Sequence, residues 1–139
     1  MAARVNRYIV SGWASTVGVI GWSIGGGHGP FAPGKGVGVD NILEATLVTA
    51  EGELLTVNAT SNSDLFWAIR GGGGSNWGIF LSVTYRMHKI PEGGITQVTT
   101  TWSGNMCENG KSLINFVDGY KNWSLSLNYR IGGLTFFVP

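Results

Sequence analysis

Residues 41–58 carry the hydrophobic and polar pattern of a β-hairpin. The stretch NILEATLVT, Asn41–Thr49, is rich in the aliphatic and β-branched residues that favour strands. Ala50–Gly52 supplies a short turn, and Glu53–Asn58 then alternates between apolar and polar side chains. The pattern therefore predicts two antiparallel strands joined by a tight turn.

A short helix and a long strand are predicted after this hairpin. In SNSDLFWAIRGGGG, Ser61 or Asn62 can cap a helix that Gly71 ends. Its core-facing residues would be Leu65, Phe66 and Ile69. Gly78–His88 then has the pattern of a strand, because alternate positions hold the apolar residues Ile79, Leu81, Val83 and Tyr85.

The pattern changes at Pro91–Gly94, which we interpret as a domain boundary. Beyond it, Ile95–Trp102 is rich in Thr and Val and predicts a strand, whereas Lys111–Lys121 has apolar residues at helical spacing. Leu125–Arg130 and Leu134–Val138 again predict strands. Helices and strands in this order indicate the α+β class.

The 139 residues are apolar and carry little charge. Charged side chains make up 12% of the chain and its net charge is +1, so we expect no face that binds nucleic acid. No apolar run approaches the roughly 20 residues of a membrane span, and we expect no membrane association. Cys107 is the single cysteine, and His28 and His88 lack the spacing of metal ligands, so we predict no metal site.

The 23 glycines are clustered, which indicates backbone that lies close to something. The stretch SIGGGHGPFAPGKGVGV, Ser23–Val39, is predicted to be a loop because Pro30 and Pro33 oppose a regular helix. It lacks the Gly-Lys-Ser/Thr of a Walker loop and the flanking elements of a dinucleotide-binding glycine motif. The interpretation that remains is a loop whose bare backbone lies along a flat cofactor. Composition alone does not identify that cofactor.

Three longer stretches resemble a known family. TVGVIGWSIGGGHGP, GVGVDNILEATLVTAEGELLTVNAT and NSDLFWAIRGGGGSNWGIFLSVTYRMH contain motifs in the order found in the berberine-bridge-enzyme-like flavoproteins of the vanillyl-alcohol-oxidase superfamily. The resemblance covers residues 12 to about 90. It implies that residues 1–90 form the second half of a PCMH-type FAD-binding domain. Residues 91–139 would then begin an α+β substrate domain.

The resemblance implies FAD as the cofactor and an oxidation as the reaction. Family members pass a hydride from an alcohol, a sugar or a similar substrate to flavin N5, and many return the electrons to oxygen. A small-molecule substrate and oxygen are therefore the expected partners. Val17 matches the position that gates oxygen, and its small side chain is similar to that of the oxidases. The residues expected at the cofactor are Val17, Gly18, Gly21, Gly25, Gly26, Gly78 and Ile79.

The chain also departs from the family pattern. Ala14 stands where many members have a cysteine bonded to the flavin, and Gly34-Lys35 replaces an aromatic pair. The family's attachment histidine lies in an upstream Gly-Gly-His loop, and His28 is not that residue. No catalytic base is identified. We therefore expect part of a larger flavoprotein or, alternatively, a truncated non-catalytic remnant that does not bind FAD on its own.

Several features have structural interpretations beside the functional ones. Gly71–Gly74 fits a helix stop as well as it fits a cofactor contact, Val17 fits a core position, and His28 is interpreted as structural. The triplets that begin at Asn58 and Asn122 match the N-glycosylation pattern. Together with the family resemblance they favour a location in the secretory pathway.

Overall fold

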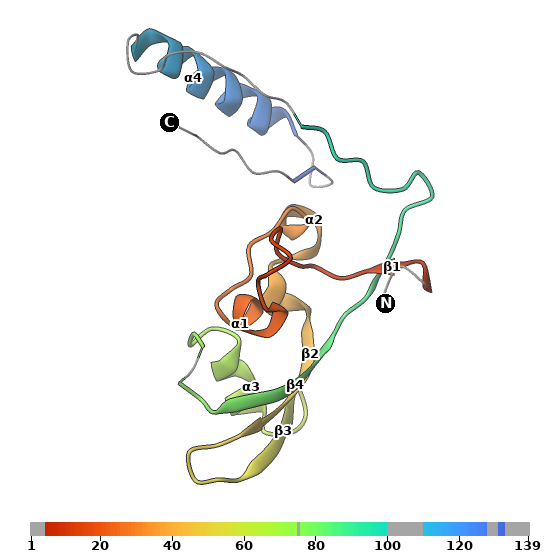
Figure 1. Cartoon of the computed structure of the whole chain (residues 1–139), viewed down its shortest axis with the longest axis vertical. Helices are drawn as coiled ribbons and strands as arrows, with labels where there is room; N and C mark the ends of the chain where they lie inside the picture. The colour runs from red at the N-terminus through yellow and green to blue at the C-terminus, as the bar shows by residue number, and fades with distance from the viewer. Residues whose placement is uncertain (1–4, 75, 100–109, 128–130, 133–139) are drawn as a thin grey trace. The chain divides into compact units, whose positions relative to one another are not determined.

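The computed structural model describes residues 5–74, 76–99, 110–127 and 131–132 (Figure 1). Contacts within the chain define two units, residues 1–90 with 130–139 and residues 91–129. Within the described residues, none of the helices is both long and apolar enough to cross a membrane.

A three-stranded antiparallel sheet forms the centre of the first unit. β2 (Ile42–Val48) lies between β3 (Leu54–Asn58) and β4 (Ile79–Tyr85). The predicted hairpin is confirmed, and the Thr49 N–H donates to the Glu53 carbonyl at 2.9 Å to close its turn. A separate two-stranded ribbon pairs β1 (Arg7–Tyr8) with β5 (His88–Lys89).

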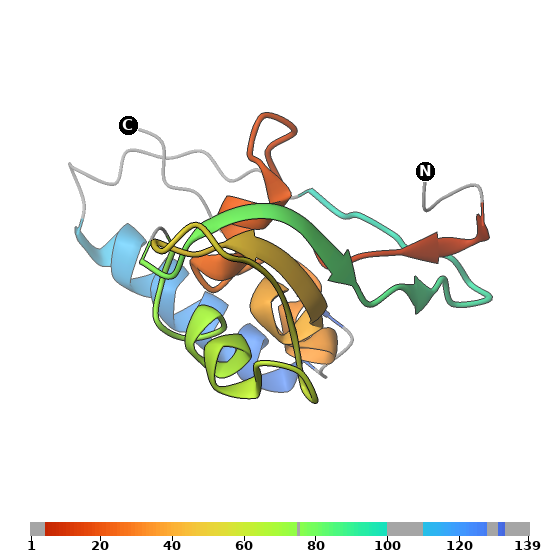
Figure 2. The same cartoon turned by 90° about the horizontal axis from the view of Figure 1, so that it is seen from below.

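One face of the sheet forms the core of this unit. Its strands contribute buried aliphatic side chains, and α3 (Ser63–Ile69) contributes Phe66 and Ile69. The buried strand residues are Ile42, Ala45, Leu47 and Val57. Figure 2 shows α2 and α3 on the same side of the sheet. The opposite face carries exposed apolar residues such as Leu54, which is 64% exposed.

The helix predicted after the hairpin is confirmed, but its predicted side-chain cap is wrong. Asn62 has a left-handed backbone, with φ of 47°, and makes no side-chain cap hydrogen bond. Its amide donates instead to the Thr56 carbonyl of β3 at 2.9 Å. Asn62 therefore fixes the start of α3 against the hairpin, because a left-handed Asn can turn the chain without a glycine.

The strand predicted at Gly78–His88 is confirmed as β4, and an irregularity interrupts its alternation. Thr46 pairs with Ser82 and Leu47 pairs with Phe80, which leaves Leu81 as an extra residue. Phe80 therefore packs against the core, whereas Ile79 is 71% exposed and Leu81 is 57% exposed. A one-residue bulge has this effect because side chains alternate between the two faces of a strand.

The prediction of a loop throughout Ser23–Val39 is wrong in part. α1 (Val19–Ile24) enters this segment, and α2 (Ala32–Lys35) and the 3-10 helix η2 (Gly38–Asn41) lie within or at its end. Pro33 is compatible with α2 because it occupies the first turn, where its missing N–H would have no helical partner.

The second unit contains α4 (Gly110–Ser126), which confirms and extends the helix predicted at Lys111–Lys121. Leu125 and Ser126 belong to this helix, so the strand predicted from Leu125 is wrong at its start. Residues 95–99 form no strand, and no described segment pairs with them. Backbone N–H and C=O groups need such a partner, whatever the propensity of the residues. Positions 100–102, 128–130 and 134–138 of the predicted strands lie outside the described residues.

Asn41 joins the two sheets of the first unit through a buried hydrogen-bond network. Its side chain is 1% exposed, and its amide donates to the carbonyls of Lys35 at 3.0 Å and Val37 at 2.9 Å. The Asn41 Oδ1 atom can only accept, so Nε2 of His88 donates to it at 2.7 Å. The Arg86 N–H donates to the Asn41 carbonyl at 2.8 Å. The turn before β2 is thereby tied to the chain that follows β4.

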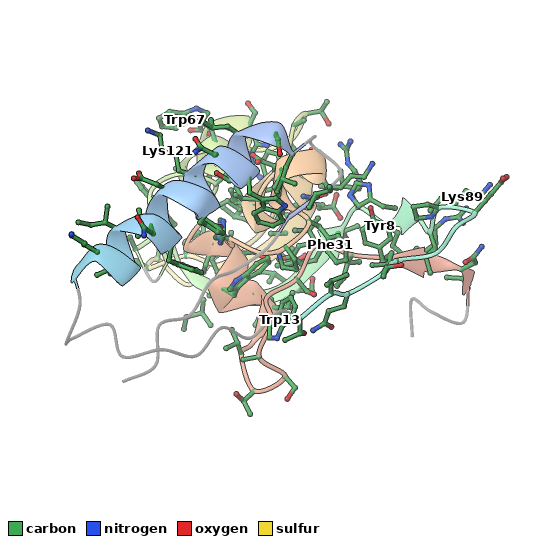
Figure 3. The ribbon with its side chains drawn as sticks, turned by 90° about the horizontal axis from the view of Figure 1, so that it is seen from above. Tyr8, Trp13, Phe31, Trp67, Lys89 and Lys121 are labelled. Carbon is green, nitrogen blue, oxygen red and sulfur yellow. The ribbon has the colours of Figure 1, made fainter. Side chains whose placement is uncertain are left out.

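Tyr8 adds an aromatic contact on each side of this network. Its ring centroid lies 4.7 Å from that of Phe31 and 5.4 Å from that of His88. Figure 3 shows the labelled Tyr8 and Phe31 side chains next to each other. His88 therefore has a hydrogen bond and a ring contact that both depend on the folded chain.

We expect the fold to lose stability when His88 is protonated. Burial and the positive charges of Lys35 and Arg86 lower the pKa of His88 from its ordinary value of 6.5. The unfolded chain then binds the proton more readily, so this contribution is complete above pH 6.5 and falls as the pH drops below that value. When the pH is lowered from about 8 to about 5, the Tm of the His88→Gln variant should fall by less than the Tm of the parent chain. Equal losses in parent and variant would contradict this expectation.

Candidate cofactor-binding surface

α1 carries the first group of predicted cofactor residues, and two contacts hold it against the sheet. Ile24 is part of the buried core. The Tyr85 hydroxyl hydrogen-bonds Ser23 Oγ and lies 3.3 Å from the Val19 carbonyl. Burial raises the pKa of Tyr85 above 10.0, and the Ser23 hydrogen bond opposes that shift. Since the hydroxyl stays protonated at neutral pH, it can link β4 to α1.

The backbone after α1 is fixed beside η2 by two hydrogen bonds. The Gly38 N–H donates to the Gly27 carbonyl at 2.7 Å, and the Val39 N–H donates to the Gly26 carbonyl at 3.1 Å. A methyl group on Gly27 would lie 2.7 Å from the Gly38 Cα atom, which is closer than real side-chain contacts. The two segments can approach this closely only because both positions are glycine.

Trp22 of α1 lies among four glycines that come from three parts of the sequence. A methyl group on Gly12 would lie 3.1 Å from Trp22 Nε1, and one on Gly27 would lie 3.0 Å from Cζ3. A methyl group on Gly29 would lie 3.4 Å from Cζ2, and one on Gly38 would overlap Cζ3. Trp22 is not among the residues that the sequence predicts at the cofactor. The available signal was an aromatic residue within a glycine-dense segment.

Other glycines of the same region face open space. Around Gly18, Gly21 and Gly26, no described atom beyond the chain neighbours or α1's own backbone lies within 4 Å of an added methyl group. Gly25 has only the carbonyls of α1 nearby, the first at 3.4 Å. Neither packing nor a left-handed φ demands glycine at Gly18 and Gly21, so their bare backbone fits close contact with a ligand, whereas the φ of +105° at Gly26 itself favours glycine. A flat cofactor needs such a surface, so the residues present fit FAD.

A hollow of about 210 Å³ lies beside α1. Val17 is 49% exposed and contributes to its wall together with Ala14 and Trp22. The wall consists of Ser11, Gly12, Trp13, Ala14, Ser15, Val17, Val19 and Trp22. Figure 3 labels Trp13 on the turn that precedes α1. Apolar side chains and the hydroxyls of Ser11 and Ser15 line the hollow.

Val17 is the one predicted cofactor residue that lines this hollow; Gly18, Gly21, Gly25 and Gly26 lie beside it on or next to α1, and Gly78 and Ile79 lie elsewhere. Gly78 has φ of +138°, and a methyl group there would overlap the Val48 carbonyl of β2. Gly78 therefore has a packing reason to be glycine. Ile79 begins β4 and does not line the hollow. A cofactor contact at these two residues stays a prediction.

The second glycine cluster packs against apolar side chains. A methyl group on Gly72 would lie 2.6 Å from Nε1 of Trp77, and one on Gly74 would lie 3.2 Å from Cδ1 of Ile24. The Gly72 N–H also donates to the Ala68 carbonyl at 2.7 Å at the end of α3. These contacts agree with the interpretation of Gly71–Gly74 as a helix stop.

The remaining candidate residues lie apart from the hollow. His28 is exposed, and His88 belongs to the Asn41 network. Among the described residues, no group of three or more His, Cys, Asp or Glu side chains could hold a metal ion. Cys107 lies outside the described residues.

Comparison with known proteins identifies the domain. A family model described as an FAD binding domain matches residues 2–58. An uncharacterized FAD-linked oxidoreductase of Arthroderma benhamiae is 46% identical over 112 residues, which are 80% of this chain and 19% of that protein. The chain thus spans about a fifth of the length of this relative.

Solved structures of three flavoproteins match the fold. The VAO-type flavoprotein VAO615 of Myceliophthora thermophila is 44% identical with a TM-score of 0.62, over 64% of this chain and 16% of that one. A BBE-like protein of Physcomitrella patens is 42% identical with a TM-score of 0.59, over 61% and 18%. A xylooligosaccharide oxidase of M. thermophila, solved with xylobiose, is 42% identical with a TM-score of 0.59, over 62% and 18%.

These matches, the antiparallel α+β architecture and the bare backbone beside α1 agree with one another. The chain therefore belongs to the FAD-linked oxidoreductases of the vanillyl-alcohol-oxidase type, with the α+β fold of their FAD-binding domain and with FAD as the family's cofactor.

Proposed function

We propose that this chain supplies part of the flavin-binding surface of an oxidase. The open backbone at Gly18 and Gly21 is the observation that carries the proposal, because neither the described neighbours nor a left-handed φ requires glycine at these two positions. FAD would accept a hydride from an alcohol, a sugar or a similar substrate, and oxygen would take the electrons. The similarity to a xylooligosaccharide oxidase supports this substrate class.

Two side chains in the hollow bear on the flavin chemistry that we propose. Val17 is small and half-exposed, which leaves space for oxygen beside the cofactor. Ala14 lines the same hollow and has no sulfur, so no thioether to the flavin can form there. We assign residues 1–90 to the C-terminal part of the FAD-binding domain and residues 91–139 to the beginning of the substrate domain.

A second proposal concerns the 139 residues by themselves. The candidate surface is open, since Gly18, Gly21 and Gly25 are exposed and Val17 is 49% exposed. A cofactor that is covered on one side loses much of the apolar contact that gives tight binding. We therefore expect contact with FAD to be weak and FAD to be lost during gel filtration. Flavin absorbance that co-elutes with the purified chain would contradict this expectation.

The FAD surface can be mapped by titrating the ¹⁵N-labelled chain with FAD and following its amide resonances. We expect the largest shifts at Gly18, Gly21 and Gly26, because their backbone is open, and smaller shifts at Gly27 and Gly38. ATP serves as the matched ligand, since it shares the adenylate but has no flavin ring. Equal shifts with ATP would count against the flavin assignment. No shifts with FAD at any concentration would favour a remnant that binds no cofactor.

Gly21→Ala should separate binding from stability. Gly21 lies inside α1 with open space around it, so alanine should stabilise the chain by about 0.5–1 kcal/mol. The added methyl group should also hold FAD away from the backbone and reduce the shifts at Gly18 and Gly26. Thermal unfolding and the same titration measure both effects. A variant that is more stable and shows unchanged FAD shifts would rule out close contact at Gly21.

A further inference from the structure

We propose that Trp22 is the positioning residue of the FAD surface: its indole ring sets the path of the backbone that presents the open glycines. The inference rests on the proposed function and goes beyond it, because Trp22 acts through the backbone around it. Trp22 lies next to Gly21 in α1 and is linked to Gly18 by its own N–H, which donates to the Gly18 carbonyl at 3.1 Å.

Both edges of the indole are in contact with glycine backbone. The edge with Nε1 faces Gly12, in the turn that lines the hollow. The opposite edge, with Cζ3, faces Gly27 and Gly38, which are themselves joined by a hydrogen bond of 2.7 Å. The ring therefore separates the turn before α1 from the backbone pair after it. A rigid, flat side chain suits this role because it has only two rotatable bonds.

The open glycine Gly26 depends directly on this packed pair. Gly26 has φ of +105° and is followed by Gly27, with φ of +80°, whose carbonyl is bonded to Gly38. The Gly26 carbonyl accepts from Val39 at 3.1 Å. If the ring were smaller, the contact at Gly27 and Gly38 would be lost and these two hydrogen bonds would open more often. The surface at Gly26 would then be less well formed for a ligand.

The tight space between Gly38 and the Trp22 ring allows a test with a compensating pair of substitutions. A methyl group on Gly38 would overlap Cζ3 of Trp22 and would lie 2.8 Å from Ser23 Oγ. Phenylalanine has a single ring and lacks the outer part of the fused indole, where Cζ3 lies. Trp22→Phe should therefore restore part of the stability that Gly38→Ala removes. Two destabilising changes that act independently would instead add.

The test uses the 139-residue chain with Trp22→Phe and Trp22→Ala. Hydrogen exchange at the Gly38 and Val39 amides reports the backbone, and the FAD titration of Gly18, Gly21 and Gly26 reports the surface. In Trp22→Ala we expect exchange about tenfold faster and an FAD affinity lower by about tenfold, with Trp22→Phe between parent and alanine. Trp67→Ala is the matched control, because Trp67 is 75% exposed and does not line the hollow.

The outcomes separate this proposal from the proposed function. Unchanged exchange in both Trp22 variants would overturn the positioning role. If Trp22→Ala unfolds, unchanged exchange in Trp22→Phe alone would overturn it. Faster exchange with unchanged FAD shifts would overturn the link to the surface. If the parent chain shows no FAD shifts, the proposed function fails. The exchange rates and the Gly38→Ala rescue then still decide whether Trp22 positions this backbone.

Discussion

The contact between the Trp22 ring and four glycines is the constraint on which the cofactor surface depends. An indole needs flat, close neighbours, and Gly12, Gly27, Gly29 and Gly38 provide them. Side chains at these positions would collide with the ring or with backbone near it. Glycine gives the unfolded chain extra conformational freedom, and folding removes it. The close packing that glycine permits around the ring offsets this entropic cost.

This packing gives the glycines of one short segment two different roles. Gly27 and Gly38 are buried against each other and against Trp22, whereas Gly18 and Gly21 have open space around them. α1 bears the open positions and is held by Ile24 in the core and by the Tyr85 hydroxyl of β4. α1 is thus held rigidly on its core side and presents bare backbone at Gly18 and Gly21, an arrangement that suits close contact with a flat ligand.

The sequence predicted the elements whose signals are local. The hairpin and α3 follow from strand propensity, turn residues and the spacing of Phe66 and Ile69, and the structure confirms both. α2 was missed because Pro33 is compatible with a first helical turn. Residues 95–99 have strand propensity but pair with no described segment, so the strand predicted there from propensity alone is wrong. The bulge at Leu81 depends on pairing with β2, which no local pattern reveals.

The candidate site was predictable only in part. Family motifs pointed to Val17, Gly18, Gly21, Gly25 and Gly26, which the structure places on or next to α1. The role of Trp22 could not be read from the sequence, because Gly12 and Gly38 come close to it only in the folded chain. Likewise, the distinction between packed and open glycines depends on neighbours that are distant in sequence.

Ring-current shifts of the glycine Hα protons test the packing around Trp22 most directly. If the indole lies among these glycines, the Hα protons of Gly12, Gly27 and Gly38 should be displaced from ordinary glycine values and should show nuclear Overhauser contacts to the ring. The Hα protons of Gly52 and Gly71, which have open surroundings, should have ordinary values. Ordinary shifts at all of these positions, with no contacts to the indole, would contradict the account.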